Sequence, residues 1–127
     1  MALAAEGGGA DALSLINTFV GLKIDVKSGK PWLANTTGGV SCPAIKPMAL
    51  SMVYETARTV KIPVIGIGGI SSVEDALEFL IAGASAIQIG TANYIDPSIT
   101  MKVIDGLYRY CKKNNLKSLT GLPSLKK

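Results

Sequence analysis

Two glycine-bearing segments contain the residues of this sequence that are best suited to form a functional site. Gly68 and Gly69 follow the apolar run VIGI, and Gly90 with Thr91 follows IQI, with one predicted helix between them. Glycine lets backbone N–H groups approach an anion closely, and the last two strand exits of a (β/α) barrel commonly form a phosphate site. The pair therefore predicts a phosphate site. The alternative interpretation is that these glycines only permit tight turns.

A second candidate site lies at the end of the apolar run ALSLI, where Asn17 and Thr18 follow. An amide and a hydroxyl at a strand tip can pair their donors and acceptors with a ligand that carries carbonyl and N–H edges. The same two residues would also serve simply to end a strand and begin a loop.

The elements that must position these groups alternate between strands and helices. A helix ends near residue 6 at Gly7, and a later one is capped by Ser71 or Ser72, with Glu74 and Asp75 in its first turn. Helix 47–60 carries an apolar stripe of Met48, Leu50, Met52, Val53 and Ala57. Strands are expected over residues 12–19, 62–67 and 86–89, and the first of them is expected to be buried on both faces. Helices are expected over residues 1–6, 47–60, 72–82 and 99–113. Segments 22–26 and 31–34 are expected to form a small hairpin over the site.

This alternation predicts an α/β fold with a parallel sheet and right-handed crossovers. Either a doubly wound sheet or part of an eight-stranded (β/α) barrel satisfies it. Three strands cannot close a barrel, so the piece is expected to leave open strand edges and an apolar inner face. Residues 1–127 are accordingly expected to form one partial domain that needs a partner chain, a second copy or a rearrangement.

Composition bounds the function further. The chain is 48% hydrophobic and 17% charged, which is typical of a folded domain. It has no histidine, and Cys42 and Cys111 stand far apart, which excludes His-based triads and predicts no metal site.

The distribution of charge and of apolar runs indicates where such a chain would work. The net charge of +4 is carried largely by the last quarter, and we interpret it as a solvated helix face and not as a nucleic-acid surface. No apolar run approaches the roughly 20 residues of a membrane helix, and residues 1–13 resemble no targeting segment, so a cytoplasmic protein is expected. The basic residues are Lys102, Arg109, Lys112, Lys113, Lys117, Lys126 and Lys127.

Four stretches together resemble the dihydroorotate dehydrogenase family: ADALSLINTF, LANTTGGVSCPAIKPMAL, IPVIGIGGISSVEDALEFLIAGASAIQIGTANY and DP. The resemblance spans nearly the whole chain and implies the C-terminal half of a (β/α)8 TIM barrel. The stretch GLKIDVKSGKPWLAN, leading into TGG and AIKP, is most similar to the NAD-linked class, the B-type catalytic subunit of class 1. In that class the FMN subunit pairs with an electron-transfer subunit that carries FAD and an iron–sulfur cluster.

The resemblance implies oxidation of dihydroorotate to orotate in pyrimidine synthesis, with a hydride passing from the substrate to FMN. The protein would position and polarise the substrate, and the flavin would carry the electrons. By motif, Asn17 and Thr18 would hydrogen-bond the pyrimidine. Ile16 would touch the flavin, and the FMN phosphate would be held by Gly68, Gly69, Gly90 and Thr91.

The sequence departs from the family pattern in two ways, one at the flavin-facing position 42 and one in its catalytic residues. Cys42 stands where the family usually has glycine against FMN, in GGVSCPAIKP, and no neighbouring base or cation in the sequence favours it as a replacement base. The family's catalytic cysteine belongs to the first half of the barrel, so no catalytic residue is expected here and the chain alone should not turn over substrate. We expect a homo-oligomer or a complementing half-barrel.

Two other functions stay open from the sequence. One is a non-catalytic, self-associating half-barrel scaffold without flavin. The other is half of a different phosphate-binding barrel.

Overall fold

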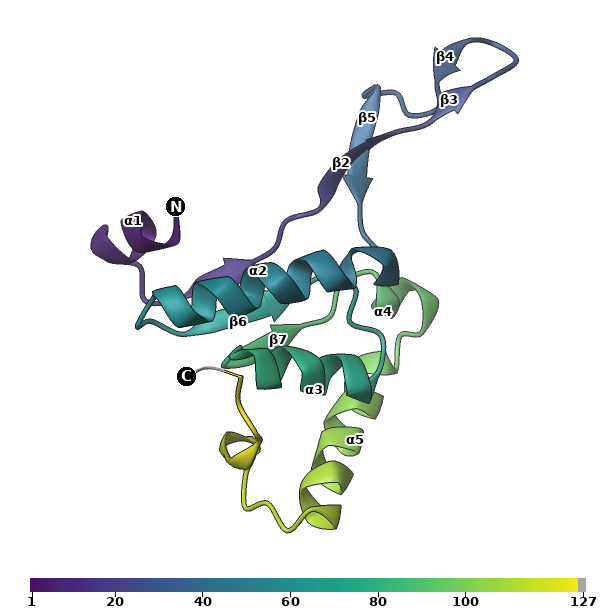
Figure 1. Ribbon diagram of the computed structural model, residues 1–127. Coiled ribbons are helices and arrows are strands. Elements are labelled where there is room, and N and C mark those ends of the chain that lie inside the picture. Colours follow the sequence, from purple (N-terminus) through teal and green to yellow (C-terminus); the bar gives the residue numbers. More distant parts are fainter. Residues whose placement is uncertain (126–127) are drawn as a thin grey trace.

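A parallel three-stranded sheet organises the protein, with helices packed on one face and a narrow ribbon projecting from one end (Figure 1). The computed structural model describes residues 1–125. The strands run in the order β1, β6, β7, with Leu13 opposite Val64 and Ile65 opposite Ala86. The predicted α/β fold with parallel strands is therefore confirmed. The strands are β1 (Leu13–Leu15), β6 (Val64–Ile67) and β7 (Ala86–Gln88).

The helices begin and end close to the predicted residues. Ser72 caps α3, accepting a hydrogen bond at 3.0 Å from the N–H of Asp75, and Gly83 ends it with φ +113°. The helices are α1 (Ala2–Gly7), α2 (Lys46–Thr59), α3 (Val73–Ala82), α4 (Ala92–Ile95) and α5 (Ile99–Lys113), with 3₁₀ turns η1 (Pro43–Ile45) and η2 (Leu119–Gly121).

The core lies between the sheet and helices α2, α3 and α5. Helix α2 presents Ala49, Val53 and Ala57, all at most 1% exposed, at helical spacing toward β6. The prediction that Met48 and Met52 belong to this stripe is wrong, because they are 47% and 50% exposed. The small alanines let α2 lie close to the sheet, and the two methionines fall on the flank of the helix.

The first strand is shorter and more exposed than predicted. The strand covers Leu13–Leu15 and is followed by one further bond to β6, from the N–H of Ile16 to the carbonyl oxygen of Ile67 at 2.9 Å. Ser14 is exposed, whereas a strand over 12–19 buried on both faces was expected. Within residues 1–125, β1 has one neighbour and lies at the edge of the sheet. The apolar run therefore ends in an irregular segment at Ile16–Thr18 before the ribbon begins.

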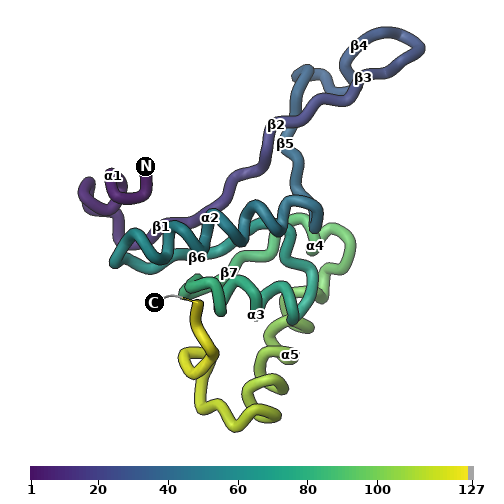
Figure 2. Tube along the Cα trace, in the orientation of Figure 1, coloured from purple at the N-terminus to yellow at the C-terminus, as the bar shows by residue number. Residues whose placement is uncertain are grey.

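The predicted hairpin is present but longer, and it is placed differently. Its two antiparallel pairs project away from the body, and the chain returns from them to the start of α2 (Figures 1 and 2). The expectation that the hairpin lies over the site is wrong: Thr18 and Ser41, on either side of the ribbon, line the cavity described below, and the ribbon between them does not. The pairs are β2 (Phe19–Leu22) with β5 (Thr37–Val40) and β3 (Ile24–Asp25) with β4 (Lys30–Pro31).

Helix α5 carries the basic residues on its outer face. Lys102, Arg109, Lys112 and Lys113 are exposed, and Lys102 pairs with Asp96 at 2.6 Å. The solvated face is thus confirmed for this helix and for exposed Lys117; Lys126 and Lys127 lie outside the described residues. Within residues 1–125, none of the helices has both the length and the apolar character needed to span a bilayer.

Candidate functional site

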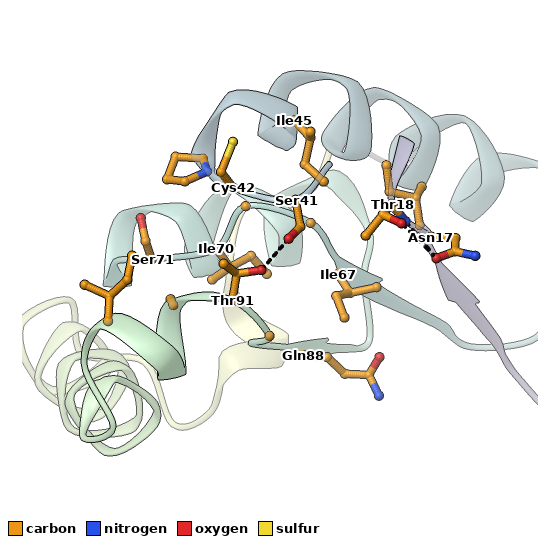
Figure 3. A pocket seen from close by; sticks show the side chains of 17 residues that line it. Asn17, Thr18, Ser41, Cys42, Ile45, Ile67, Ile70, Ser71, Gln88 and Thr91 are labelled. Carbon is orange, nitrogen blue, oxygen red and sulfur yellow. Dashed lines mark hydrogen bonds between the residues drawn. The ribbon is translucent and has the colours of Figure 1, made fainter. Parts of the chain in front are cut away.

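A cavity of about 250 Å³ opens at the carboxyl ends of the three parallel strands (Figure 3). Ligand sites of α/β sheets gather at this edge because the loops that leave neighbouring strands converge there. All eight residues that the sequence singled out line this one cavity: Ile16, Asn17, Thr18, Cys42, Gly68, Gly69, Gly90 and Thr91. Their roles toward a ligand stay predictions.

The exit of β6 has a backbone that requires glycine. Gly69 has φ +73°, and a Cβ there would lie 2.7 Å from the carbonyl oxygen of Cys42 and 3.0 Å from Lys46 Cβ. Gly68 has φ +139°, and a Cβ there would lie 2.6 Å from Ala49 Cβ. Helix α2 therefore presses directly on this loop, and only residues without a side chain allow the close packing.

The exit of β7 is open where the exit of β6 is crowded. A Cβ on Gly90 would meet no atom within 4 Å, and both Gly90 and Thr91 are exposed. Among residues 1–125, no group accepts a hydrogen bond from the backbone N–H of Gly69, Ile70, Gly90 or Thr91. The two exits thus bring a set of unused donors to one cavity, as an anion site requires.

A hydroxyl pair closes the side of the cavity next to the ribbon. Ser41 Oγ lies 2.6 Å from Thr91 Oγ1 and connects the residue after β5 with the exit of β7 (Figure 3). Either hydroxyl can be the donor, so a ligand oxygen could take the place of one partner.

Asn17 and Thr18 lie at the β1 end of the cavity and contact each other. The N–H of Thr18 donates to Asn17 Oδ1 at 2.8 Å, and the amide oxygen is turned back toward its neighbour (Figure 3). Both side chains are exposed. They are therefore accessible to a ligand.

Cys42 occupies a backbone conformation that any residue can adopt, with φ 164° and ψ 178°. The departure from the family's glycine therefore introduces no backbone strain at this position. The side chain is half-buried, and in Figure 3 its sulfur lies on the side away from the Ser41–Thr91 contact. Its carbonyl oxygen, and not its thiol, faces Gly69.

An ion pair lies behind the β6 exit. Lys46 Nζ contacts Asp75 Oδ1 at 2.6 Å and Glu78 Oε2 at 3.0 Å. Burial by itself would raise the pKa of Asp75, but hydrogen bonds from Lys46, Ser71 and Ser72 outweigh it and hold this pKa at about 2. Hydrogen bonds to Asp75 and Glu78 raise the pKa of Lys46. Both groups are therefore charged at neutral pH.

Sequence reasoning missed several polar groups of the cavity. Ser41 and Ser71 line it, and so does Gln88, whose Oε1 accepts from Ser14 Oγ at 2.9 Å across the open face of the sheet. Gln88 is the polar residue of the run IQI, at the strand tip before Gly90, and the rule that placed Asn17 would also have found it. The further lining residues are Pro43, Ile45, Ile67, Ile70, Ala92 and Ile95.

Parallel strands whose exit loops line one cavity define an α/β protein with a candidate ligand site at the carboxyl edge of its sheet. The family profile described as dihydroorotate dehydrogenase matches residues 1–110. The chain belongs to this family.

Curated relatives agree with that assignment. The chain is 55% identical over 122 residues to the catalytic subunit of dihydroorotate dehydrogenase B (NAD(+)) from Parabacteroides distasonis, covering 96% of this chain and 40% of the relative. It is 57% identical over 120 residues to the subunit of the same description from Bacteroides fragilis, covering 94% and 40%. For that of Thermoanaerobacter pseudethanolicus the identity is 57% over 118 residues, covering 93% and 39%.

The chain thus spans about 40% of the length of these relatives. The resemblance to the NAD-linked, B-type subunit that the sequence motifs indicated is confirmed. That the matching part is the C-terminal half stays a prediction.

Proposed function

We propose that this chain forms the part of a dihydroorotate dehydrogenase that holds the phosphate of FMN and one side of the pyrimidine substrate. The observation that carries the proposal is that the exits of β6 and β7 line one cavity with unused backbone donors. Family membership makes a flavin phosphate the anion that best explains such donors.

The residues present fit a phosphate group. Gly69 packs closely against Cys42 and Lys46 and lines the cavity, while Gly90 offers open space where a side chain would otherwise intrude. A volume of about 250 Å³ is below the roughly 300–1,000 Å³ of sites that enclose a whole ligand. The cavity would therefore take the phosphate end, and the ring system would lie toward the open sheet face near Ile16.

The substrate end of the site would be formed by Asn17 and Thr18. Their amide and hydroxyl suit the carbonyl and N–H edges of dihydroorotate or orotate, and Ile16 would contact the flavin between substrate and phosphate. When bound, FMN would supply the hydride-accepting chemistry of pyrimidine synthesis. The chain's own residues would bind and orient, and Cys42 would lie against the cofactor without acting as a base.

The rest of the activity would come from elsewhere. We place the chain in the C-terminal half of a (β/α)8 barrel, as a single partial domain that needs the other half to turn over substrate. The relatives are named as NAD(+)-linked catalytic subunits, which favours an electron-transfer subunit with FAD and an iron–sulfur cluster as a further partner.

A second candidate function is a self-associating scaffold without flavin. It is favoured by the two sheet edges, at β1 and β7, and by the exposed side chains of Ser14, Ala86 and Gln88 on the face opposite α2 and α3. Two copies could pair these edges with each other.

One titration decides between the two functions. Purified chain is titrated with FMN and, separately, with riboflavin, which has the same ring system without the phosphate, and flavin fluorescence is followed. The proposed function predicts that FMN binds at least about tenfold more tightly, since charge-assisted N–H contacts to phosphate are roughly twice as strong as neutral ones. Equal binding, or none, contradicts it; a dimer without flavin would then support the scaffold.

A further inference from the structure

The exit loop of β6 is held from behind by a charged pair that does not itself line the cavity. Lys46 is the first residue of α2, and Asp75 lies in the first turn of α3. Their contact of 2.6 Å joins the two helices that flank the loop, and the side chains are only 23% and 12% exposed. Neither residue is among those that line the cavity, so neither contacts a ligand there directly.

The carboxylate of Asp75 uses its two oxygens for different partners. Oδ1 accepts from Lys46, while Oδ2 accepts from the backbone N–H of Ser71 at 2.9 Å and from its hydroxyl at 3.0 Å. Ser71 lines the cavity, two residues after Gly69. One carboxylate therefore fixes the downstream end of the loop and connects it to α2.

The upstream end of the loop packs closely against the same lysine residue. The Cβ position of Gly69 is blocked by the carbonyl oxygen of Cys42 and, at 3.0 Å, by the backbone nitrogen and Cβ of Lys46. The first residue of α2 thus packs closely against Gly69 with its backbone and is connected to Ser71 through its side chain and Asp75. Between these two anchors lie the unused N–H groups of Gly69 and Ile70.

We propose that Lys46 and Asp75 are positioning residues, which hold the Gly69–Ile70 donors in the conformation that accepts a phosphate. The inference rests on the proposed function of the cavity and adds the device that keeps its donors aligned. Glu78 also contacts Lys46, but it is 45% exposed and touches neither end of the loop, so it is not part of this device.

The direction in which one substitution changes FMN affinity separates a positioning role from a purely electrostatic effect. Asp75→Ala removes a negative charge near the phosphate, and the loss of this Coulomb repulsion alone would make FMN bind more tightly. Loss of the Ser71 and Lys46 contacts releases the loop, and positioning predicts the opposite, a loss of about tenfold in FMN affinity, the size expected when aligned hydrogen bonds are lost. Asp75→Asn, whose amide oxygen can still accept from Ser71, is expected to fall between Asp75→Ala and the unsubstituted chain.

Riboflavin and Glu78→Gln serve as controls. Riboflavin lacks the phosphate, so its affinity is expected to stay within about twofold in Asp75→Ala, whereas general damage to the fold would weaken both flavins alike. Glu78→Gln removes a charge from the same lysine and is expected to leave the preference for FMN over riboflavin unchanged. The melting temperature of each variant shows whether it is folded, and Asp75→Asn, which also removes the negative charge, replaces Asp75→Ala if that variant does not fold.

The outcomes are distinct. If the unsubstituted chain shows no preference for FMN, the proposed function fails. If it shows that preference and folded Asp75→Ala retains it or binds FMN more tightly, the positioning inference fails while the proposed function stands. If Asp75→Asn has to replace Asp75→Ala, a retained or raised affinity for FMN overturns the inference and a loss specific to FMN supports it.

Discussion

The hydroxyls of Ser41 and Thr91 are 2.6 Å apart although the two residues are separated by 50 positions in the chain. Ser41 follows the last strand of the ribbon, and Thr91 follows β7, the last strand of the sheet. The contact connects the base of a projecting element to one wall of the candidate site. A change in the ribbon can thereby reach the cavity.

Removing this contact is expected to weaken the fold modestly. Ser41→Ala leaves Thr91 Oγ1 without its partner, and the free energy of unfolding should fall by about 1 kcal/mol, the usual net value of one hydrogen bond. Urea denaturation measures the change. Thr91→Ser, which keeps a hydroxyl at the other end, is the control and should cost clearly less. An unchanged midpoint in Ser41→Ala would show that the contact does not stabilise the protein.

A charge placed at the β7 exit should weaken phosphate binding strongly. Gly90→Asp puts a carboxylate into space where no atom lies within 4 Å of the new Cβ, so the fold is retained while the anion is repelled. We expect FMN affinity to fall by about tenfold or more. Isothermal titration with FMN measures it. Gly90→Asn, of equal size and no charge, is the matched control, and equal losses in both variants would count against an anion at this position.

The β6 exit should tolerate no side chain at Gly69. Gly69→Ala combines φ +73° with a collision at 2.7 Å against the Cys42 carbonyl oxygen, and we expect a loss of about 2–4 kcal/mol in the free energy of unfolding. Gly29 has nearly the same φ, +67°, with no atom within 4 Å of a Cβ. Gly29→Ala therefore measures the cost of the dihedral alone, about 1 kcal/mol. If chemical denaturation gives equal losses, the packing of α2 on this loop is not tight.

Acid should lower the free energy of unfolding because it protonates Asp75. Its pKa is about 2 in the folded chain against 3.8 when unperturbed, so its stabilising contribution is present above pH 3.8 and is lost as the pH falls toward 2. The difference corresponds to about 2 kcal/mol in the free energy of unfolding. Asp96 and Asp25 have pKa values shifted in the same direction, so the free energy of unfolding of the unsubstituted chain is compared with that of Asp75→Asn between pH 5 and 2. The slope should be smaller in the variant; identical slopes would contradict the assignment.

The helices and the meeting of the two glycine-bearing strand exits could be predicted because their signals are local. Helix α3 carries its own start and stop, with Ser72 as the cap and Gly83 in the left-handed conformation, and both act within a few residues. Parallel strands end at the same sheet edge, so placing Gly68 and Gly90 after neighbouring strands was enough to bring them together.

The errors came from features that depend on distant neighbours. Met48 and Met52 have the residue type of a core, but exposure is decided by which side of α2 meets the sheet. The length of β1 depends on how many strands flank it. The direction of the ribbon depends on the contacts at its base. The Lys46–Asp75 pair escaped notice for the same reason, since its partners are 29 residues apart and no periodicity joins them.

Chemical labelling should report on the cavity through its cysteine. Cys42 lines the cavity, whereas Cys111 lies in α5, outside it, and both thiols are half-buried. If FMN phosphate binds beside the β6 exit, saturating FMN should slow alkylation of Cys42 by iodoacetamide several-fold and leave Cys111 unchanged, because only the first thiol loses access to reagent. Mass spectrometry of the two cysteine peptides gives both rates from one sample, so Cys111 serves as the internal control. Riboflavin should protect less than FMN. Equal rates for Cys42 with and without FMN, at concentrations where binding is saturated, would place the flavin away from this wall and remove Cys42 from the site.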